Sequence, residues 1–151
     1  MSENKHYILV SGGRFSKVYG RNQIFLELIR TIVTKYDNLS FVFIGNGNSA
    51  TMQKFINRHN LKEKWTIIPY RNDLPAFLSS CDIYISTFPM FGGLMTQTAA
   101  FVGLPIVELD SKTGNFSEDV LPFLDGCNIT FGTQAECIDR VGELINDDKL
   151  R

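Results

Sequence analysis

The chain has 151 residues, of which 44% are hydrophobic, so it is long enough for one domain with a substantial core. Fifteen basic and sixteen acidic residues give a net charge of -1, and no stretch concentrates lysine or arginine, which argues against nucleic-acid binding. The first apolar run is too short for a membrane span. The odd cysteine count, with Cys81, Cys127 and Cys137 lacking metal-type spacing, favours a reducing cytoplasm and predicts no metal site.

Short apolar runs alternate along the chain with segments of helical periodicity. The runs predict six strands, at Tyr7–Ser11, Phe41–Gly45, Trp65–Pro69, Asp82–Ser86, Pro105–Leu109 and Asn128–Phe131. Helical spacing runs from Ile24 to Val33, and further helices are expected at Ser49–His59, Asp73–Ser80, Leu94–Val102 and Thr133–Asn146. Because parallel strands need crossover connections, the alternation predicts an α/β fold with a doubly wound, mostly parallel, Rossmann-like sheet of six strands.

The glycines gather where the predicted strands end. Loops are expected at Gly12-Gly13-Arg14, at Gly45-Asn46-Gly47-Asn48, at Pro69-Tyr70-Arg71 and between Phe88 and Gly93. Ligands of parallel α/β sheets bind beyond the carboxyl ends of the strands. The sequence therefore predicts the functional site on this edge of the sheet.

A glycine pair at the start of the helix after the fourth strand is the strongest single signal. Gly92 and Gly93 leave backbone N–H groups uncovered at the positive end of a helix dipole, which suits an anion such as phosphate. We expect the phosphate site to comprise Gly92, Gly93, Leu94, Met95 and Thr96. The alternative is a tight turn whose glycines serve packing alone.

With these loops in place, the chain resembles the C-terminal, donor-binding half of a two-domain GT-B glycosyltransferase, especially the group 1 family that uses nucleotide sugars. Gly13-Arg14-Phe15 followed by Arg21-Asn22-Gln23 is similar to the family's Gly-Arg-Leu and Lys-Asn-Gln segments. Gly45-Asn46-Gly47 resembles its Gly-x-Gly loop. The spacing from Gly93 through Gly103 to Pro105 is similar to its glycine loop, helix and Gly-x-Pro-Val-Val segment.

The resemblance implies roles for residues at these loops. Arg14 and Arg21, beside Gly13, would meet the donor diphosphate, although either could be an ordinary surface cation. Thr98 would contact the ribose, and the ribose and base site would also include Tyr70, Arg71, Gly45 and Gly47, unless these form plain turns. Group 1 enzymes usually carry two glutamates eight positions apart around the glycine loop. Met90 and Thr98 stand there in this chain.

The resemblance implies a nucleotide-sugar-dependent glycosyltransferase of polysaccharide biosynthesis, acting on a glycan, lipid-linked or protein acceptor. Its donor would be UDP- or GDP-linked, and no further cofactor is expected. We expect the 151 residues to be one domain truncated from a larger protein, inactive alone and without identifiable catalytic residues. An N-terminal acceptor-binding domain, in the same protein or in a separate chain, would complete the enzyme. The enzyme would be cytoplasmic, and it would lie at the inner face of a membrane if the N-terminal domain binds that membrane.

Two alternatives remain open from the residues alone. A non-catalytic interaction module that kept the fold would account for Met90 and Thr98. A nucleotide-sugar epimerase of the same fold would share the phosphate loop, but the acidic and histidine groups that it needs are not found at suitable positions. Binding of a nucleoside diphosphate distinguishes a working donor site from a relic.

Overall fold

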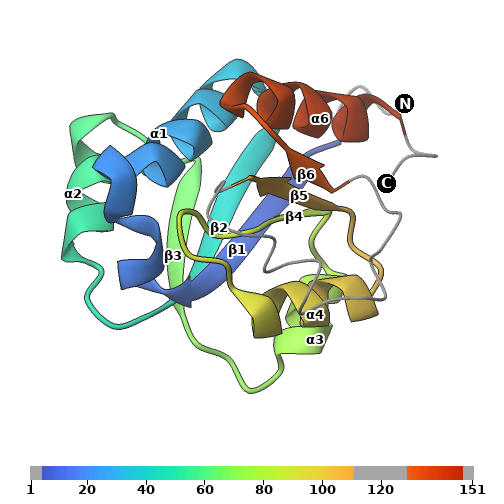
Figure 1. Cartoon of the computed structure of the whole chain (residues 1–151), viewed down its shortest axis with the longest axis horizontal. Helices are drawn as coiled ribbons and strands as arrows, with labels where there is room; N and C mark the ends of the chain where they lie inside the picture. The colour runs from blue at the N-terminus through green and yellow to red at the C-terminus, as the bar shows by residue number, and fades with distance from the viewer. Residues whose placement is uncertain (1–4, 111–128, 148–151) are drawn as a thin grey trace.

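Six parallel strands form one sheet at the centre of the computed structural model, which describes residues 5–110 and 129–147 (Figure 1). The strands lie in the order β3-β2-β1-β4-β5-β6, and every pairing between them is parallel. Their bounds are β1 Tyr7–Arg14, β2 Leu39–Asn46, β3 Trp65–Pro69, β4 Ile83–Ile85, β5 Ile106–Leu109 and β6 Thr130–Phe131. The predicted α/β fold class is confirmed.

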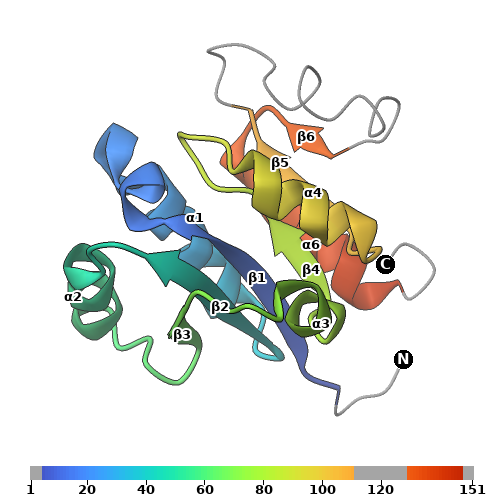
Figure 2. The same ribbon diagram turned by 90° about the horizontal axis from the view of Figure 1, so that it is seen from below.

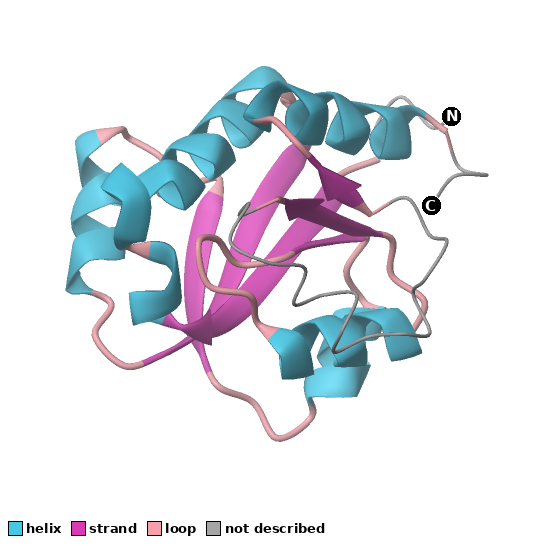
Figure 3. Ribbon diagram, in the orientation of Figure 1, coloured by secondary structure: helices cyan, strands magenta, loops and turns pink. Residues whose placement is uncertain are grey.

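Helices cover both faces of the sheet (Figures 2 and 3). One face carries α1, α2 and α6, and the other carries α3 and α4, so the sheet is doubly wound (Figure 1). The helices span α1 Gly20–Lys35, α2 Ala50–Arg58, α3 Leu74–Ser79, α4 Gly93–Phe101 and α6 Gln134–Asn146, and a short 3₁₀ helix, η1, covers Phe15–Val18. The predicted helices occur with ends shifted by one or two residues, apart from the start of the first.

Alternating strand residues supply two separate cores, because successive side chains of a strand point to opposite faces. The larger core lies beneath α1, α2 and α6 and is rich in aromatic rings. There Trp65 packs edge-on against Phe41 with ring centroids 5.2 Å apart. The smaller core, beneath α3 and α4, contains Ile44, Tyr84 and Met95.

The first two strands are longer than the sequence predicted. Gly12 pairs with Ile44, and Arg14 pairs with Asn46, so residues expected in loops extend the ladder between β1 and β2. Packing accounts for the glycines inside these strands. A Cβ atom at Gly12 would lie 2.5 Å from the Met95 Cε atom, and one at Gly45 would lie 2.0 Å from the Phe15 Cζ atom. The extension places Arg14 and Asn46 side by side at the edge of the sheet.

The start of α1 differs from a regular helix. Arg21, Asn22 and Gln23 have φ angles of 50°, 57° and 59°, which form a left-handed turn before the right-handed helix continues. Left-handed backbone costs roughly 1–2 kcal/mol per residue for side chains with a Cβ atom. Helical periodicity from Ile24 onward marked the regular part of α1, whereas nothing in the side-chain pattern marked this turn.

Candidate functional site

A pocket of about 400 Å³ opens where β1, β2 and β3 end and α4 begins. It lies at the carboxyl edge of the parallel sheet, where ligands of this architecture bind. Its walls come from segments far apart in the sequence and consist of Gly12, Gly13, Arg14, Lys17, Ile44, Asn46, Tyr70, Asn72, Leu74, Pro75, Gly92, Leu94, Met95 and Thr98. Seven of these residues belong to the site predicted from the sequence: Gly13, Arg14, Tyr70, Gly92, Leu94, Met95 and Thr98.

The start of α4 contributes free backbone donors to this region. The Thr96 N–H donates to the Gly92 carbonyl at 3.0 Å, and this is the first bond of the helix. The N–H groups of Gly93, Leu94 and Met95 therefore precede the first turn and have no acceptor within the helix. Together with the helix dipole they favour a negatively charged group at the pocket wall formed by Gly92, Leu94 and Met95.

Two cations line the same pocket, one from the end of β1 and one from η1. Arg14 is exposed, and Lys17 follows within the next turn of chain, so both line the pocket. Gly13 between strand and turn has φ of +133°, a conformation that residues with a side chain rarely adopt. Among residues 5–110 and 129–147, no aspartate or glutamate lines the pocket. The electrostatics of the pocket therefore favour an anion.

The other polar residues of the lining are uncharged and include an aromatic ring. Tyr70, just after β3, is 62% exposed, and its neighbour Asn72 also lines the pocket. The Thr98 hydroxyl lies on α4 and donates to the Leu94 carbonyl at 2.9 Å, which leaves the oxygen lone pairs for a further donor. These residues offer a stacking surface and neutral hydrogen-bonding groups.

Sequence reasoning gave no role to Asn46 and Asn72, and only a weak one to Lys17. The side-chain pattern gave no signal for Asn46, because the ladder between β1 and β2 continues to this residue past the end of the apolar run at Ile44. Lys17 follows Arg14 by three residues, which is about one turn of the 3₁₀ helix η1, and both residues line the pocket. This spacing was the sequence signal for Lys17. Asn72 had no comparable signal.

Several predicted site residues do not line the pocket, and the structure shows other contacts for them. The Arg21 guanidinium lies over the Phe88 ring, 5.4 Å from its centroid. Thr96 is buried, and its hydroxyl donates to the Gly92 carbonyl at 2.8 Å. Gly45 faces the Phe15 ring inside β2, and Gly47 takes a φ of +104° in the turn that follows. Gly93 is the first residue of α4 and contributes its backbone alone.

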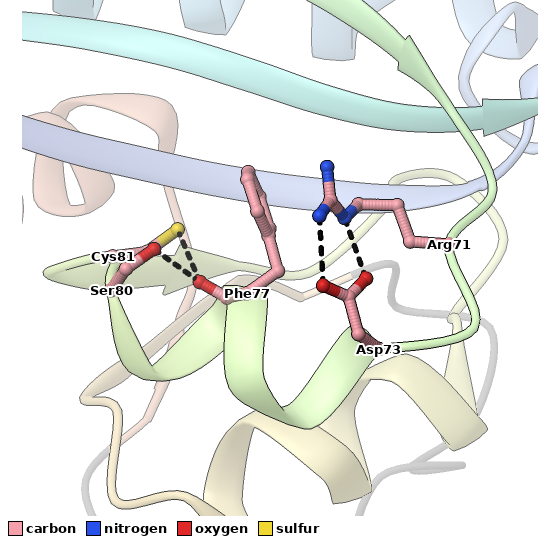
Figure 4. Close-up of polar contacts among 5 residues, drawn as sticks. All are labelled: Arg71, Asp73, Phe77, Ser80 and Cys81. Atoms are coloured by element: carbon pink, nitrogen blue, oxygen red, sulfur yellow. Dashed lines mark hydrogen bonds and ion pairs between the residues drawn. The ribbon is translucent and has the colours of Figure 1, made fainter.

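Arg71, which the sequence placed at the ribose and base, is paired with Asp73 outside the pocket wall (Figure 4). Two hydrogen bonds of 2.8 Å join the Arg71 guanidinium to the two oxygens of the Asp73 carboxylate. The same guanidinium lies 4.8 Å from the centroid of the Phe77 ring. These contacts hold the segment between β3 and α3, from which Tyr70 and Asn72 reach the pocket.

This ion pair has an expected signature in the pH dependence of Asp73. The hydrogen bonds from Arg71 lower the pKa of the Asp73 carboxyl, and its charge adds to the effect. A carboxyl with a lowered folded-state pKa contributes stability above its unfolded pKa, and this is lost as the pH falls through the folded value. Arg71→Gln should therefore raise the pKa of Asp73, as measured by NMR titration of its carboxyl carbon. Both groups are exposed, so the melting temperature should change little.

Arg140→Gln provides the control for this titration. Arg140 forms an ion pair with Glu143 on α6, at 3.0 Å, and its removal should leave the titration of Asp73 unchanged. If Asp73 titrated identically in the Arg71→Gln variant and the unaltered chain, the ion pair would be absent in solution.

Strand order and two-faced helix packing define a doubly wound α/β domain with a pocket at the carboxyl edge of its sheet. The family model described as glycosyl transferases group 1 matches residues 6–147, and the chain belongs to this family. No curated protein matched the sequence.

Solved structures of glycosyltransferases share the fold. An O-GlcNAc transferase mutant from Thermobaculum terrenum has a TM-score of 0.78 at 21% identity, over 94% of this chain and 29% of that one. A TarM mutant from S. aureus, in complex with fondaparinux, alpha-GlcNAc-glycerol and UDP, has a TM-score of 0.77 at 19% identity, over 99% and 31%. The C-terminal domain of the group 1 family protein LpcC from Francisella tularensis has a TM-score of 0.69 at 20% identity, over 96% and 77%. The chain thus spans about a third of the first two proteins and has the fold of one GT-B half.

Among the residues that the structure describes, no helix is long and apolar enough to cross a membrane. Within the same residues, no group of three or more histidine, cysteine, aspartate or glutamate side chains could hold a metal ion. Cys81 and Cys137 are buried free thiols, and Cys127 lies outside the described residues.

Proposed function

We propose that this chain is the donor-binding half of a nucleotide-sugar-dependent glycosyltransferase and binds a UDP- or GDP-linked sugar. One observation carries the proposal: Arg14, Lys17 and the free N–H groups at the start of α4 lie at a pocket whose described lining residues include no carboxylate. Such a pocket suits the diphosphate of the donor. The TarM relative was solved with UDP, which supports a uridine nucleotide.

In this proposal the chain stabilises the leaving group. Negative charge develops on the diphosphate as its bond to the sugar breaks, and positioned N–H groups and cations then interact more strongly with it than in the ground state. The exposed Tyr70 ring provides a stacking surface for the base, and the Thr98 hydroxyl lies on the wall assigned to the ribose. Both assignments belong to the proposal.

The acceptor side of the reaction would come from elsewhere. GT-B transferases, which this chain resembles, react in a cleft between two domains, and the described pocket opens from one of them. We assign the acceptor, a glycan, a lipid-linked sugar or a protein, to an N-terminal domain of the same protein or of a separate chain. The reaction would then serve polysaccharide biosynthesis on the cytoplasmic side.

Titration of the 151-residue chain with UDP, GDP and ADP, followed by amide NMR, tests this function. We expect at least one nucleotide to shift the resonances of Gly13, Gly92, Gly93 and Leu94, with modest affinity because only one half of the cleft is present. Inorganic diphosphate should shift the residues of the α4 start but not those around Tyr70. Absence of all these shifts at millimolar ligand would favour the non-catalytic module instead.

A further inference from the structure

A chain of buried hydroxyl groups lies directly beneath the start of α4. Tyr84, in the central strand β4, is completely buried, and its hydroxyl oxygen lies 3.2 Å from the Thr96 Oγ1 atom. Thr96 is also completely buried, and its Oγ1 atom lies 2.8 Å from the Gly92 carbonyl oxygen. Three groups from β4, α4 and the preceding loop are thus joined in the interior.

The chemistry of the groups fixes the direction of these hydrogen bonds. A carbonyl oxygen can only accept, so the single Thr96 hydroxyl proton goes to Gly92. The Thr96 oxygen can then accept the proton of the Tyr84 hydroxyl, for which Ser11 is a second hydrogen-bonding neighbour. Burial raises the pKa of the Tyr84 phenol, so this proton stays in place at neutral pH.

The last acceptor in this chain belongs to the peptide that opens the helix. The Gly92 carbonyl and the Gly93 N–H are parts of one planar trans peptide, so they point in opposite directions and turn together. Holding the Gly92 carbonyl against Thr96 therefore also fixes the Gly93 N–H, which points away from Thr96. A side chain at position 92 would be crowded, because a Cβ atom there would lie 3.1 Å from the Thr87 Oγ1 atom.

The loop before Gly92 is held in a similar way. The Thr87 hydroxyl donates to the Met90 carbonyl at 2.6 Å, and Thr87 is 3% exposed. Glycine has the greatest backbone freedom, so a Gly-Gly helix start needs external contacts to hold one conformation. The buried threonine and tyrosine hydroxyls provide them.

We propose that Tyr84 and Thr96 are positioning residues, which hold the first peptide of α4 so that its N–H groups are ready to receive the diphosphate. This inference rests on the proposed function, because it assigns the orientation of the same anion site. Neither side chain lines the pocket, so both act through the Gly92–Gly93 peptide. Preorganised donors cost less to order when the ligand arrives, which strengthens binding.

Calorimetry with UDP, GDP and inorganic diphosphate on single variants tests the assignment. Tyr84→Phe keeps the buried ring and removes the hydroxyl, and it should weaken binding about threefold to tenfold, the range for one hydrogen bond. Thr96→Val removes the hydroxyl at constant shape and should have a similar effect. Thr96→Ser keeps the hydroxyl and should bind within about twofold of the unaltered chain.

Tyr36→Phe is the matched control, because Tyr36 donates to the Ile138 carbonyl at 2.8 Å on the opposite face of the sheet. It loses one tyrosine hydrogen bond and should bind normally. If the unaltered chain binds but Thr96→Val and Thr96→Ser bind equally well, the inference is overturned and the proposed function stands. If Tyr84→Phe fails to fold, the two Thr96 variants still decide. If the unaltered chain binds none of the three ligands, the proposed function fails and the positioning role with it.

Discussion

Replacing Arg14 with glutamine is expected to weaken nucleoside diphosphate binding roughly tenfold to a hundredfold, the range for a charge-assisted hydrogen bond. Arg14 lies at the end of β1 and lines the same pocket as Gly92, Leu94 and Met95 at the start of α4. Glutamine retains much of the side-chain length but not the charge. Calorimetric titration with UDP and GDP measures the change, and amide NMR of the free variant verifies that the fold is intact.

Arg58→Gln is the control for this experiment. Arg58 is an exposed cation in the last turn of α2 and does not line the pocket, so its loss changes the net charge of the chain equally. It should alter affinity by less than about twofold, because exposed charges beyond about 10 Å are screened at 0.1 M salt. Equal binding by the Arg14→Gln variant and the unaltered chain would place the diphosphate away from the end of β1.

The second large effect is expected on stability. Gly45→Ala should destabilise the fold by about 1–3 kcal/mol, the usual cost of forcing an extra group into a packed core. The added Cβ atom would lie 2.0 Å from the Phe15 Cζ atom, and the Phe15 ring has little room to move because it packs on Phe43 at 5.3 Å and on Tyr19 at 6.4 Å. Urea unfolding followed by circular dichroism measures the difference.

A double-mutant cycle with Phe15→Leu identifies the cause. The shorter leucine relieves the contact, so Gly45→Ala should cost less in the Phe15→Leu background than in the unaltered chain. Additive effects of the two substitutions would show that the Phe15 ring is not what excludes a side chain at position 45. Gly47→Ala is a useful comparison, because no atom lies within 4 Å of a Cβ there, and any cost would come from its φ of +104°.

The sheet could be predicted from the sequence because its strands are short apolar runs separated by helical periodicity. The strands predicted at Tyr7–Ser11 and Phe41–Gly45 extend in the structure to Tyr7–Arg14 and Leu39–Asn46, beyond the large apolar residues at their carboxyl ends. Glycines at 12 and 45 looked like loop residues, since the rings and side chains packed over them come from elsewhere in the sequence. The left-handed turn at Arg21 could not be predicted either, because the local side-chain types do not specify it.

Backbone features of the pocket were easier to predict than side-chain contacts. The Gly92-Gly93 helix start and Arg14 lie where the strand-to-loop pattern placed them, on the carboxyl edge of the sheet. Thr96 was assigned to the ligand, but its neighbour in space, Tyr84, lies twelve residues earlier and could not be connected with it from spacing. Arg71 looked like a ligand contact, although the carboxylate of Asp73 stands only two residues away in the sequence.

Trp65 gives the molecule an optical signal of its own. It is the chain's one tryptophan, and it is buried against Phe41 and Phe55 beneath α2, on the face of the sheet opposite α4. Its fluorescence should therefore follow the integrity of the larger core and respond weakly to a nucleotide at the pocket. Tyr70, in contrast, lines the pocket and is open to solvent. Unfolding of the larger core can thus be followed through Trp65 with or without nucleotide at the pocket, without attaching a dye.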